Sequence, residues 1–179
     1  MGYRHDRDDI VRAGIDVVLE EGLGALSFGK VAKSLGISDR MVVYYFASKD
    51  VLITTVVTAM GAQLQELLEG AFPSRASADD LVRTAWPILA SNKVDSLMAV
   101  YFEIVGLAST KKEPFVALSA ALVEAWVTWI SDLVIGDSAA ERRRLALSVV
   151  ARVDGLLMVR QVCGARAAND AARALGIID

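Results

Sequence analysis

One segment, SFGKVAKSLGISDRMVVYYFASKDVL at residues 27–52, constrains the fold of this chain more than any other. Ser27 can cap a helix over residues 28–35, because a serine side chain accepts a hydrogen bond from the free N–H groups at a helix start. Gly36 then allows a sharp turn, since glycine adopts positive φ without steric cost. Ser38 can cap a second, short helix over residues 39–45. Two short helices joined by a tight turn predict a helix-turn-helix near the N-terminus.

The rest of the chain predicts helices as well. Only three prolines, frequent Ala, Leu and Val, and no alternating strand pattern favour an all-α protein. Ser48 can cap a fourth helix, and the segment FPSRAS at 72–77 is expected to be a linker. Pro87 is expected to lie well inside the helix that follows and to kink it. The expected helices cover residues 6–21, 28–35, 39–45, 48–70, a segment that begins at 78 and continues well past Pro87, then 94–109, 114–134, 139–163 and 165–175, which makes nine.

These elements suggest two domains. We expect a head at residues 1–54 that contains the helix-turn-helix, and a larger helical body at residues 71–179. The fourth helix, to about residue 70, connects the two. No internal repeat is visible.

Composition points to a folded cytoplasmic protein with extra buried surface. Apolar residues make up 54% of the chain, above the usual value of about 45–50%, which suggests a subunit interface or an apolar cavity. The longest uncharged run, residues 51–65, is shorter than the roughly 18–20 apolar residues that a membrane span needs. The charged N-terminus is unlike a secretory signal, and the lone Cys163 excludes an intrachain disulfide.

The net charge of the chain argues against a protein that binds DNA through general electrostatic attraction to the phosphates. The chain carries a net charge of −3, and residues 1–54 contain seven Lys or Arg and eight Asp or Glu, which gives −1. Binding to DNA would therefore depend on a few well-placed contacts. We expect a dimer, which doubles the number of phosphate contacts.

Three sequence pieces in register carry a family resemblance. They are EEG at 20–22, VAKSLGIS at 31–38 and YYFASKDVL at 44–52. Residues 7–54 resemble the N-terminal domain of TetR-type bacterial transcriptional repressors. The family usually has a tyrosine where this chain has Val43, and Tyr44 and Tyr45 could take over the backbone contact of that tyrosine. The resemblance implies an all-α regulator whose C-terminal domain binds a small inducer that shifts the two DNA-binding heads apart.

The short helix over residues 39–45 is expected to enter the major groove of double-stranded DNA. Its expected exposed residues are Asp39, Arg40, Met41 and Tyr44. Arg40 can donate two hydrogen bonds to guanine, and Met41 can pack on a thymine methyl group. The family resemblance implies further phosphate contacts from Ser27, Ser38, Tyr45 and Lys49, the last in the first turn of the fourth helix, where free N–H groups favour an anion.

Each of these residues also has a simpler interpretation. Tyr44, Tyr45 and Phe46 could be core residues, and one or two of the three are expected to be. Arg40 could be an ordinary solvated side chain. Asp39 repels phosphate, so it either accepts a hydrogen bond from a cytosine amine or caps the helix, and capping is favoured.

Large side chains in the body predict a pocket for a small hydrophobic or aromatic ligand. Candidate polar anchors are the Tyr101 hydroxyl, the indole N–H groups, Thr128 and Asn92. The alternative is that the large residues only fill the core. The candidate ligand-binding residues are Trp86, Met98, Tyr101, Phe102, Leu122, Trp126 and Trp129.

The helix over residues 139–163 is apolar on more than one face, which is typical of a helix buried on two sides. Together with the alanine-rich last helix it could form a four-helix homodimer interface, and the family resemblance implies the same two helices. Asp154, among apolar neighbours, is expected to pair with Arg152, Arg160 or an arginine of a partner chain. The candidate interface residues are Leu147, Val150, Leu157, Ala168 and Ala172.

The leading hypothesis is a sequence-specific homodimeric repressor, bound to a palindromic operator and released by a small-molecule effector. A DNA-binding regulator with a protein partner or no effector, and a helical adaptor without DNA activity, are the alternatives. An enzyme is not expected: there is one His, one Cys and no glycine-rich phosphate loop. No catalytic residue, cofactor or metal site is expected, since His5 at the chain terminus is a poor chelator.

Overall fold

The computed structural model describes residues 5–72 and 74–179. Arg4, which entered the charge of the head, and Pro73, in the expected linker, lie outside the described residues. Within those residues the fold is all-α, as predicted, with nine α-helices and a short 3-10 turn. The elements are α1 (Arg7–Glu21), η1 (Leu23–Ala25), α2 (Phe28–Leu35), α3 (Asp39–Tyr45), α4 (Lys49–Glu69), α5 (Ala78–Leu89), α6 (Asn92–Ser109), α7 (Phe115–Leu133), α8 (Ala139–Cys163) and α9 (Ala165–Ala174).

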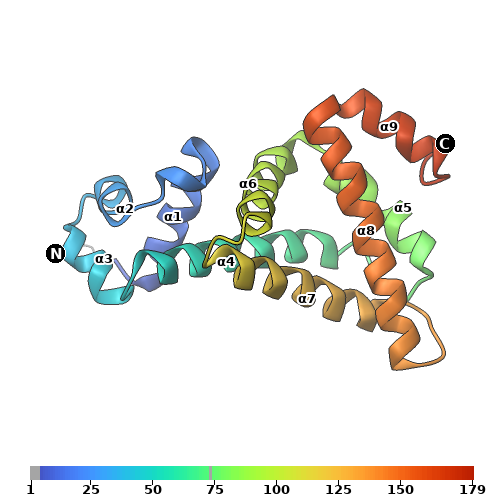
Figure 1. Cartoon of the computed structure of the whole chain (residues 1–179), viewed down its shortest axis with the longest axis horizontal. Helices are drawn as coiled ribbons and strands as arrows, with labels where there is room; N and C mark the ends of the chain where they lie inside the picture. The colour runs from blue at the N-terminus through green and yellow to red at the C-terminus, as the bar shows by residue number, and fades with distance from the viewer. Residues whose placement is uncertain (1–4, 73) are drawn as a thin grey trace.

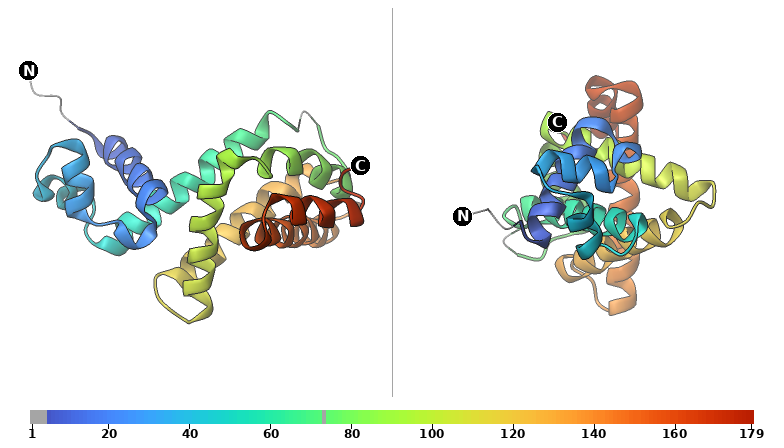
Figure 2. Two further views of the ribbon diagram at one scale, coloured as in Figure 1. Left: turned by 90° about the horizontal axis from the view of Figure 1, so that it is seen from above. Right: turned by 90° about the vertical axis from the view of Figure 1, so that its left-hand side faces the viewer.

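The molecule is elongated, with the head at one end. Helices α1 to α3 gather at that end, and α4 runs from them into the middle of the molecule (Figure 1). Helices α8 and α9 lie at the opposite end, together with the C-terminus (Figures 1 and 2). Helix α4 is therefore the continuous connection between the head and the larger helical body.

Serine side chains start four of the helices, among them the predicted Ser27 and Ser48. Each accepts a hydrogen bond from the N–H group three residues later, which satisfies a donor that has no partner inside the helix. The pairs are Ser27 with Lys30, Ser48 with Val51, Ser77 with Asp80 and Ser138 with Glu141. The start of α3 differs from the prediction: the Ser38 side chain makes no capping bond, and only its carbonyl accepts, from the Met41 N–H at 2.9 Å.

One expectation about the chain between α4 and α6 needs correction. Pro87 does not lie well inside a long helix but in the last turn of α5, which ends at Leu89, so the proline marks the end of the helix. Within the expected linker, Ala76 is bonded to the body: its N–H donates to the Leu133 carbonyl at 3.0 Å, and its carbonyl accepts from the Ile135 N–H at 2.9 Å.

Two clusters of buried apolar side chains hold the fold together. The first, which we call the cluster under the head, is formed mainly by residues of α1 to α4, and the second lies within the body. Helix α4 contributes to both, with Val56 in the first and Leu64 in the second. Helices α4 and α7 are also long and apolar enough to cross a membrane by length and composition alone, but their apolar faces pack into these clusters.

Candidate nucleic-acid interface and ligand cavity

The turn between α2 and α3 is built on the backbone of Gly36. Its φ is 66°, in the left-handed region that glycine favours. Gly36 N–H donates to the Lys33 carbonyl at 3.3 Å, and Ile37 N–H donates to the Ala32 carbonyl at 3.0 Å. This pair of bonds is the Schellman motif, which satisfies the last carbonyls of α2. It fixes the direction in which the chain enters α3.

Helix α3 is anchored on one face and open on the other. Val42 and the following Phe46 are fully buried in the cluster under the head. Asp39, Arg40, Met41 and Tyr44 are exposed as predicted, and Tyr44 is 82% exposed. Val43 is exposed too, and the sequence interpretation missed it. The spacing of 40, 43 and 44 on one helix face was the signal that could have included it.

The three consecutive aromatic residues divide between surface and core. Tyr44 points to solvent, Tyr45 is half-buried, and Phe46 is buried. The rings of Tyr44 and Tyr45 pack edge to face with centroids 5.2 Å apart, and the Arg7 guanidinium lies 5.2 Å from the centre of the Phe46 ring. Tyr44 is therefore free to contact a ligand, and Tyr45 supports its orientation.

Two basic side chains near α3, Arg40 and Lys49, have no acidic partner among the residues at 5–72 and 74–179. Arg40 and Lys49 are exposed and form no salt bridge within the described part of the chain, whereas Lys30 is paired with Glu21. Lys49 is the first residue of α4, beside the helix N-terminus, where the helix dipole favours negative charge.

The remaining predicted phosphate ligands lie at helix starts. The Ser27 hydroxyl is half-buried and already accepts the Lys30 N–H. Ser38 is exposed at the start of α3. Asp39 forms no hydrogen bond that caps α3 among the described residues; its Oδ2 would lie 3.4 Å from a Cβ placed on Gly29, so α2 and α3 approach closely here. DNA contact by these residues stays a prediction.

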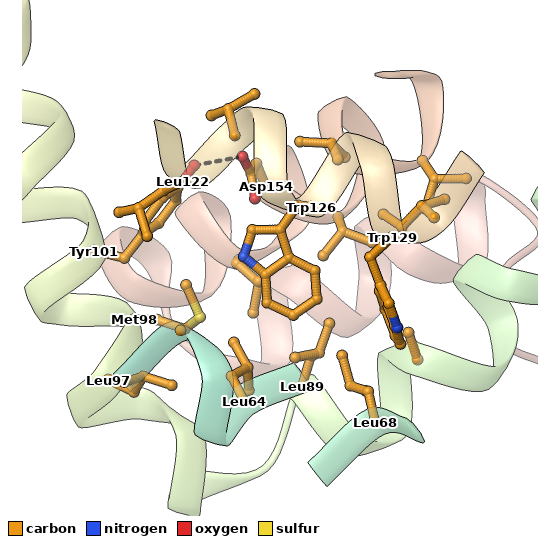
Figure 3. Close-up of a pocket in the computed structure, with 18 of the residues that line it drawn as sticks. Leu64, Leu68, Leu89, Leu97, Met98, Tyr101, Leu122, Trp126, Trp129 and Asp154 are labelled. Carbon is orange, nitrogen blue, oxygen red and sulfur yellow. Dashed lines mark hydrogen bonds between the residues drawn. The ribbon is translucent and has the colours of Figure 1, made fainter. Parts of the chain in front are cut away.

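The body contains an apolar cavity of about 110 Å³. All five helices from α4 to α8 contribute to its wall, and Figure 3 shows the Trp126 indole projecting into it. Leu64 and Leu68 of α4 lie on the side of the cavity opposite α7 in that view. Val57, Met60, Val100 and Ile104 belong both to this wall and to the cluster under the head. The cavity therefore lies at the junction of the two clusters.

Five of the seven predicted ligand residues line the cavity: Met98, Tyr101, Leu122, Trp126 and Trp129. Trp86 does not. The cavity face of α5 is formed by Leu81, Ala85 and Leu89, and the next residue on a helix is rotated by about 100°, so Trp86 is buried elsewhere in the core. Phe102 is also outside the wall and packs against the Tyr101 ring, with centroids 5.3 Å apart.

The sequence interpretation also missed a charged residue in the wall. Asp154 of α8 faces the cavity, and its Oδ2 accepts a hydrogen bond from the Tyr101 hydroxyl at 2.8 Å (Figure 3). It does not pair with the arginines of its own helix, because Arg152 binds Asp79 and Arg160 binds Asp95. Burial raises the pKa of Asp154, although the Tyr101 hydrogen bond works to lower it. Burial next to this carboxylate also raises the pKa of Tyr101.

The predicted interface residues are mostly inside the single chain. Ala168 and Ala172 are fully buried where α9 packs on the body, and Val150 and Leu157 line the cavity. Only Leu147 is exposed. Helix α8 instead exposes a stripe of apolar and small residues at intervals of three or four, which we call the α8 stripe: Leu147, Ala151, Gly155, Met158 and Val162. Periodicity alone could not separate the outer face of α8 from its two inner faces.

Comparisons with known proteins agree with this architecture. Residues 10–56 match the family described as "Bacterial regulatory proteins, tetR family". No curated protein matches the sequence significantly.

Several solved structures share the fold over nearly the whole chain. A TetR-family transcriptional regulator from Rhodococcus sp. is 19% identical, with a TM-score of 0.73 over 96% of this chain and 97% of that one. The multidrug binding protein EbrR, complexed with proflavin, is 20% identical, with a TM-score of 0.67 over 96% and 99%. A transcriptional regulator from Saccharomonospora viridis, in complex with choline, is 16% identical, with a TM-score of 0.68 over 93% and 95%.

The helix-turn-helix, the match over residues 10–56 and the fold shared over nearly the whole chain agree with one another. Residues 10–56 of this chain match the tetR family of bacterial regulatory proteins, and the chain as a whole has the fold of a TetR-family transcriptional regulator from Rhodococcus sp..

Proposed function

We propose that this chain is a cytoplasmic, homodimeric repressor that binds a palindromic operator and is released by a small molecule with an apolar or aromatic body. Residues 1–54 are the DNA-binding domain and residues 71–179 the ligand-binding and dimerisation domain. The observation that carries the proposal is the course of α4. Its first residue is Lys49, beside the exposed face of α3, and Leu64 and Leu68 in its second half line the cavity.

A second helix supports coupling between the cavity and the head. Tyr101 of α6 bonds Asp154 in the cavity wall at 2.8 Å, and two residues later Glu103 Oε2 accepts the Leu23 N–H of η1 at 3.3 Å. The start of α6 is held by Arg160, which donates to Asp95 at 2.6 Å. A ligand that displaces the Tyr101 side chain therefore acts on a helix fixed at its start and bonded to the head further along.

The mechanism is a shift between two conformations. Ligand binds better to the conformation in which the two α3 helices of the dimer do not match successive major grooves, which lie about 34–36 Å apart. The ligand-bound structures of EbrR with proflavin and of the Saccharomonospora viridis regulator with choline support a ligand site in this fold.

Dimerisation is proposed to use the α8 stripe. Its residues are apolar or small, and Val162 is 79% exposed in the single chain, so a partner chain would bury surface that is costly to leave in water. Met158→Arg should produce monomers in sedimentation velocity. Thr128→Arg, at an exposed position of α7, is the matched control and should leave the dimer intact. Dimers of unchanged stability in Met158→Arg would place the interface elsewhere.

The decisive experiment selects bound fragments from a random DNA pool with the purified protein at a stated salt concentration. A two-fold-related motif is expected. Arg40→Ala and Lys49→Ala should weaken binding to that motif, while Lys93→Ala, which removes an exposed lysine in the first turn of α6, should not. If no motif is enriched by folded protein, or if all three variants bind alike, the chain acts as a helical adaptor instead.

A further inference from the structure

The wall of the cavity contains a single charged side chain among the described residues, that of Asp154. Tyr101 donates one hydrogen bond to its Oδ2, and no hydrogen bond reaches its Oδ1 within the described part of the chain. An ionised carboxylate has about four acceptor positions, so most of its hydrogen-bonding capacity is unused. The other side chains that line the cavity are apolar or aromatic.

None of the basic residues that the structure describes neutralises this carboxylate. Arg152 donates to Asp79 at 2.6 Å, and Arg160 donates to Asp95 at 2.6 and 2.9 Å. Asp154 forms no salt bridge in the part of the chain that the structure describes. A half-buried carboxylate that lacks a counter-ion is costly, and a bound positive charge would remove that cost.

Aromatic rings line the same cavity as the carboxylate. The indoles of Trp126 and Trp129 are nearly perpendicular, at 82°, with centroids 5.4 Å apart, and Phe72 lies edge to face on Trp129 at 5.9 Å. Aromatic faces attract organic cations, most strongly where water is excluded. One carboxylate and several aromatic rings surround the same apolar cavity. Such a cavity suits a positively charged ligand whose remaining surface is apolar.

From this arrangement we infer that the cavity binds a lipophilic monovalent organic cation, a quaternary ammonium or an aromatic amine, with Asp154 as its counter-ion and Trp126 and Trp129 as its aromatic wall. The inference rests on the proposed function, in which this cavity is the effector site. It adds the charge of the effector, and it predicts that a neutral molecule of the same shape binds more weakly. The cavity volume of about 110 Å³ is comparable with that of a cavity that accepts one benzene ring, about 150 Å³.

The test uses two probes of the same shape and different charge. Phenyltrimethylammonium carries the positive charge, and tert-butylbenzene is its neutral isostere. Binding to the full-length protein is measured by quenching of tryptophan fluorescence and by calorimetry. The wild type should bind the cation at least about tenfold more tightly than the isostere. Asp154→Asn should lose about tenfold or more of the affinity for the cation and keep its affinity for tert-butylbenzene, which also reports that the variant is folded.

Asp132→Asn is the matched control, because it removes one exposed carboxylate of α7 outside the cavity wall; it should bind both probes as the wild type does. Equal binding of the two probes, or unchanged cation affinity in Asp154→Asn, overturns the inference but leaves the cavity as an effector site. Absence of binding by either probe also overturns it, and the operator selection then decides separately whether the chain is a regulator.

Discussion

Replacement of Gly36 by alanine should destabilise the head through backbone strain alone. The φ of Gly36 is 66°, and a Cβ placed there would meet no atom within 4 Å, so no steric clash contributes. Holding a residue with a Cβ in the left-handed region costs about 1–2 kcal/mol. Alanine also restricts the unfolded chain more than glycine does, and this lower entropy of the unfolded state stabilises the folded protein by roughly 0.4–1 kcal/mol. The net loss in the free energy of unfolding should therefore be about 1 kcal/mol.

Gly70→Ala is the matched control for this prediction. Gly70 is exposed, also has no atom within 4 Å of an added Cβ, and has a φ of −65° that any residue adopts. Alanine there should raise the free energy of unfolding by about 0.4–1 kcal/mol. The gain cancels in the comparison, so the two variants should differ by the strain cost alone, about 1–2 kcal/mol.

Urea denaturation followed by circular dichroism measures this difference. With a slope of about 2–3 kcal/mol per molar urea, the midpoints of the two variants should lie roughly 0.3–1 M apart. The operator affinity of Gly36→Ala should fall as well, because the same turn directs α3. Midpoints that move together, or a more stable Gly36→Ala variant, would refute the argument that the positive φ of Gly36 is what requires glycine.

Three further predictions concern the DNA contact, the cavity and the core. Lys49→Ala should reduce the slope of log affinity against log salt by about two for a dimer, one for each lost phosphate contact; an unchanged slope would exclude that contact. Because burial raises the pKa of Asp154, the folded protein binds this proton more tightly than the unfolded chain. The wild type should therefore lose stability as pH rises from the ordinary aspartate value of about 4 through the raised folded value. Tyr101 is the other titratable side chain in the described wall, and it stays protonated in this range. Asp154→Asn should not lose this stability, so urea midpoints of the two proteins should diverge over that window, and parallel curves would contradict it. Trp86→Ala should cost about 3–5 kcal/mol of stability without a change in probe affinity of the folded protein, whereas Trp126→Ala should weaken binding of the probes; the reverse pattern would show that Trp86 belongs to the site.

Local sequence signals determined the helices and the head. The serines at 27, 48, 77 and 138 and the glycine at 36 act within a few residues of their own position, so their effects can be predicted without the rest of the chain. The exposed residues of α3 could also be predicted from the local sequence, with the exception of Val43. Pro87 was misplaced because the pattern did not reveal that α5 ends two residues later.

The cavity and the outer face of α8 were decided by tertiary structure. Helical periodicity tells which residues share a face, but the rotation of one helix against its neighbours decides what that face meets. This is why Trp86 faces the core while Trp126 faces the cavity. Helix α8 has apolar residues all round, so its sequence could not distinguish the side that packs on α9, the side that lines the cavity and the exposed stripe. Asp154 accepts a hydrogen bond from Tyr101, which is 53 residues away in the chain. The packing of α6 against α8 brings these two side chains together, and no local sequence pattern could predict their contact.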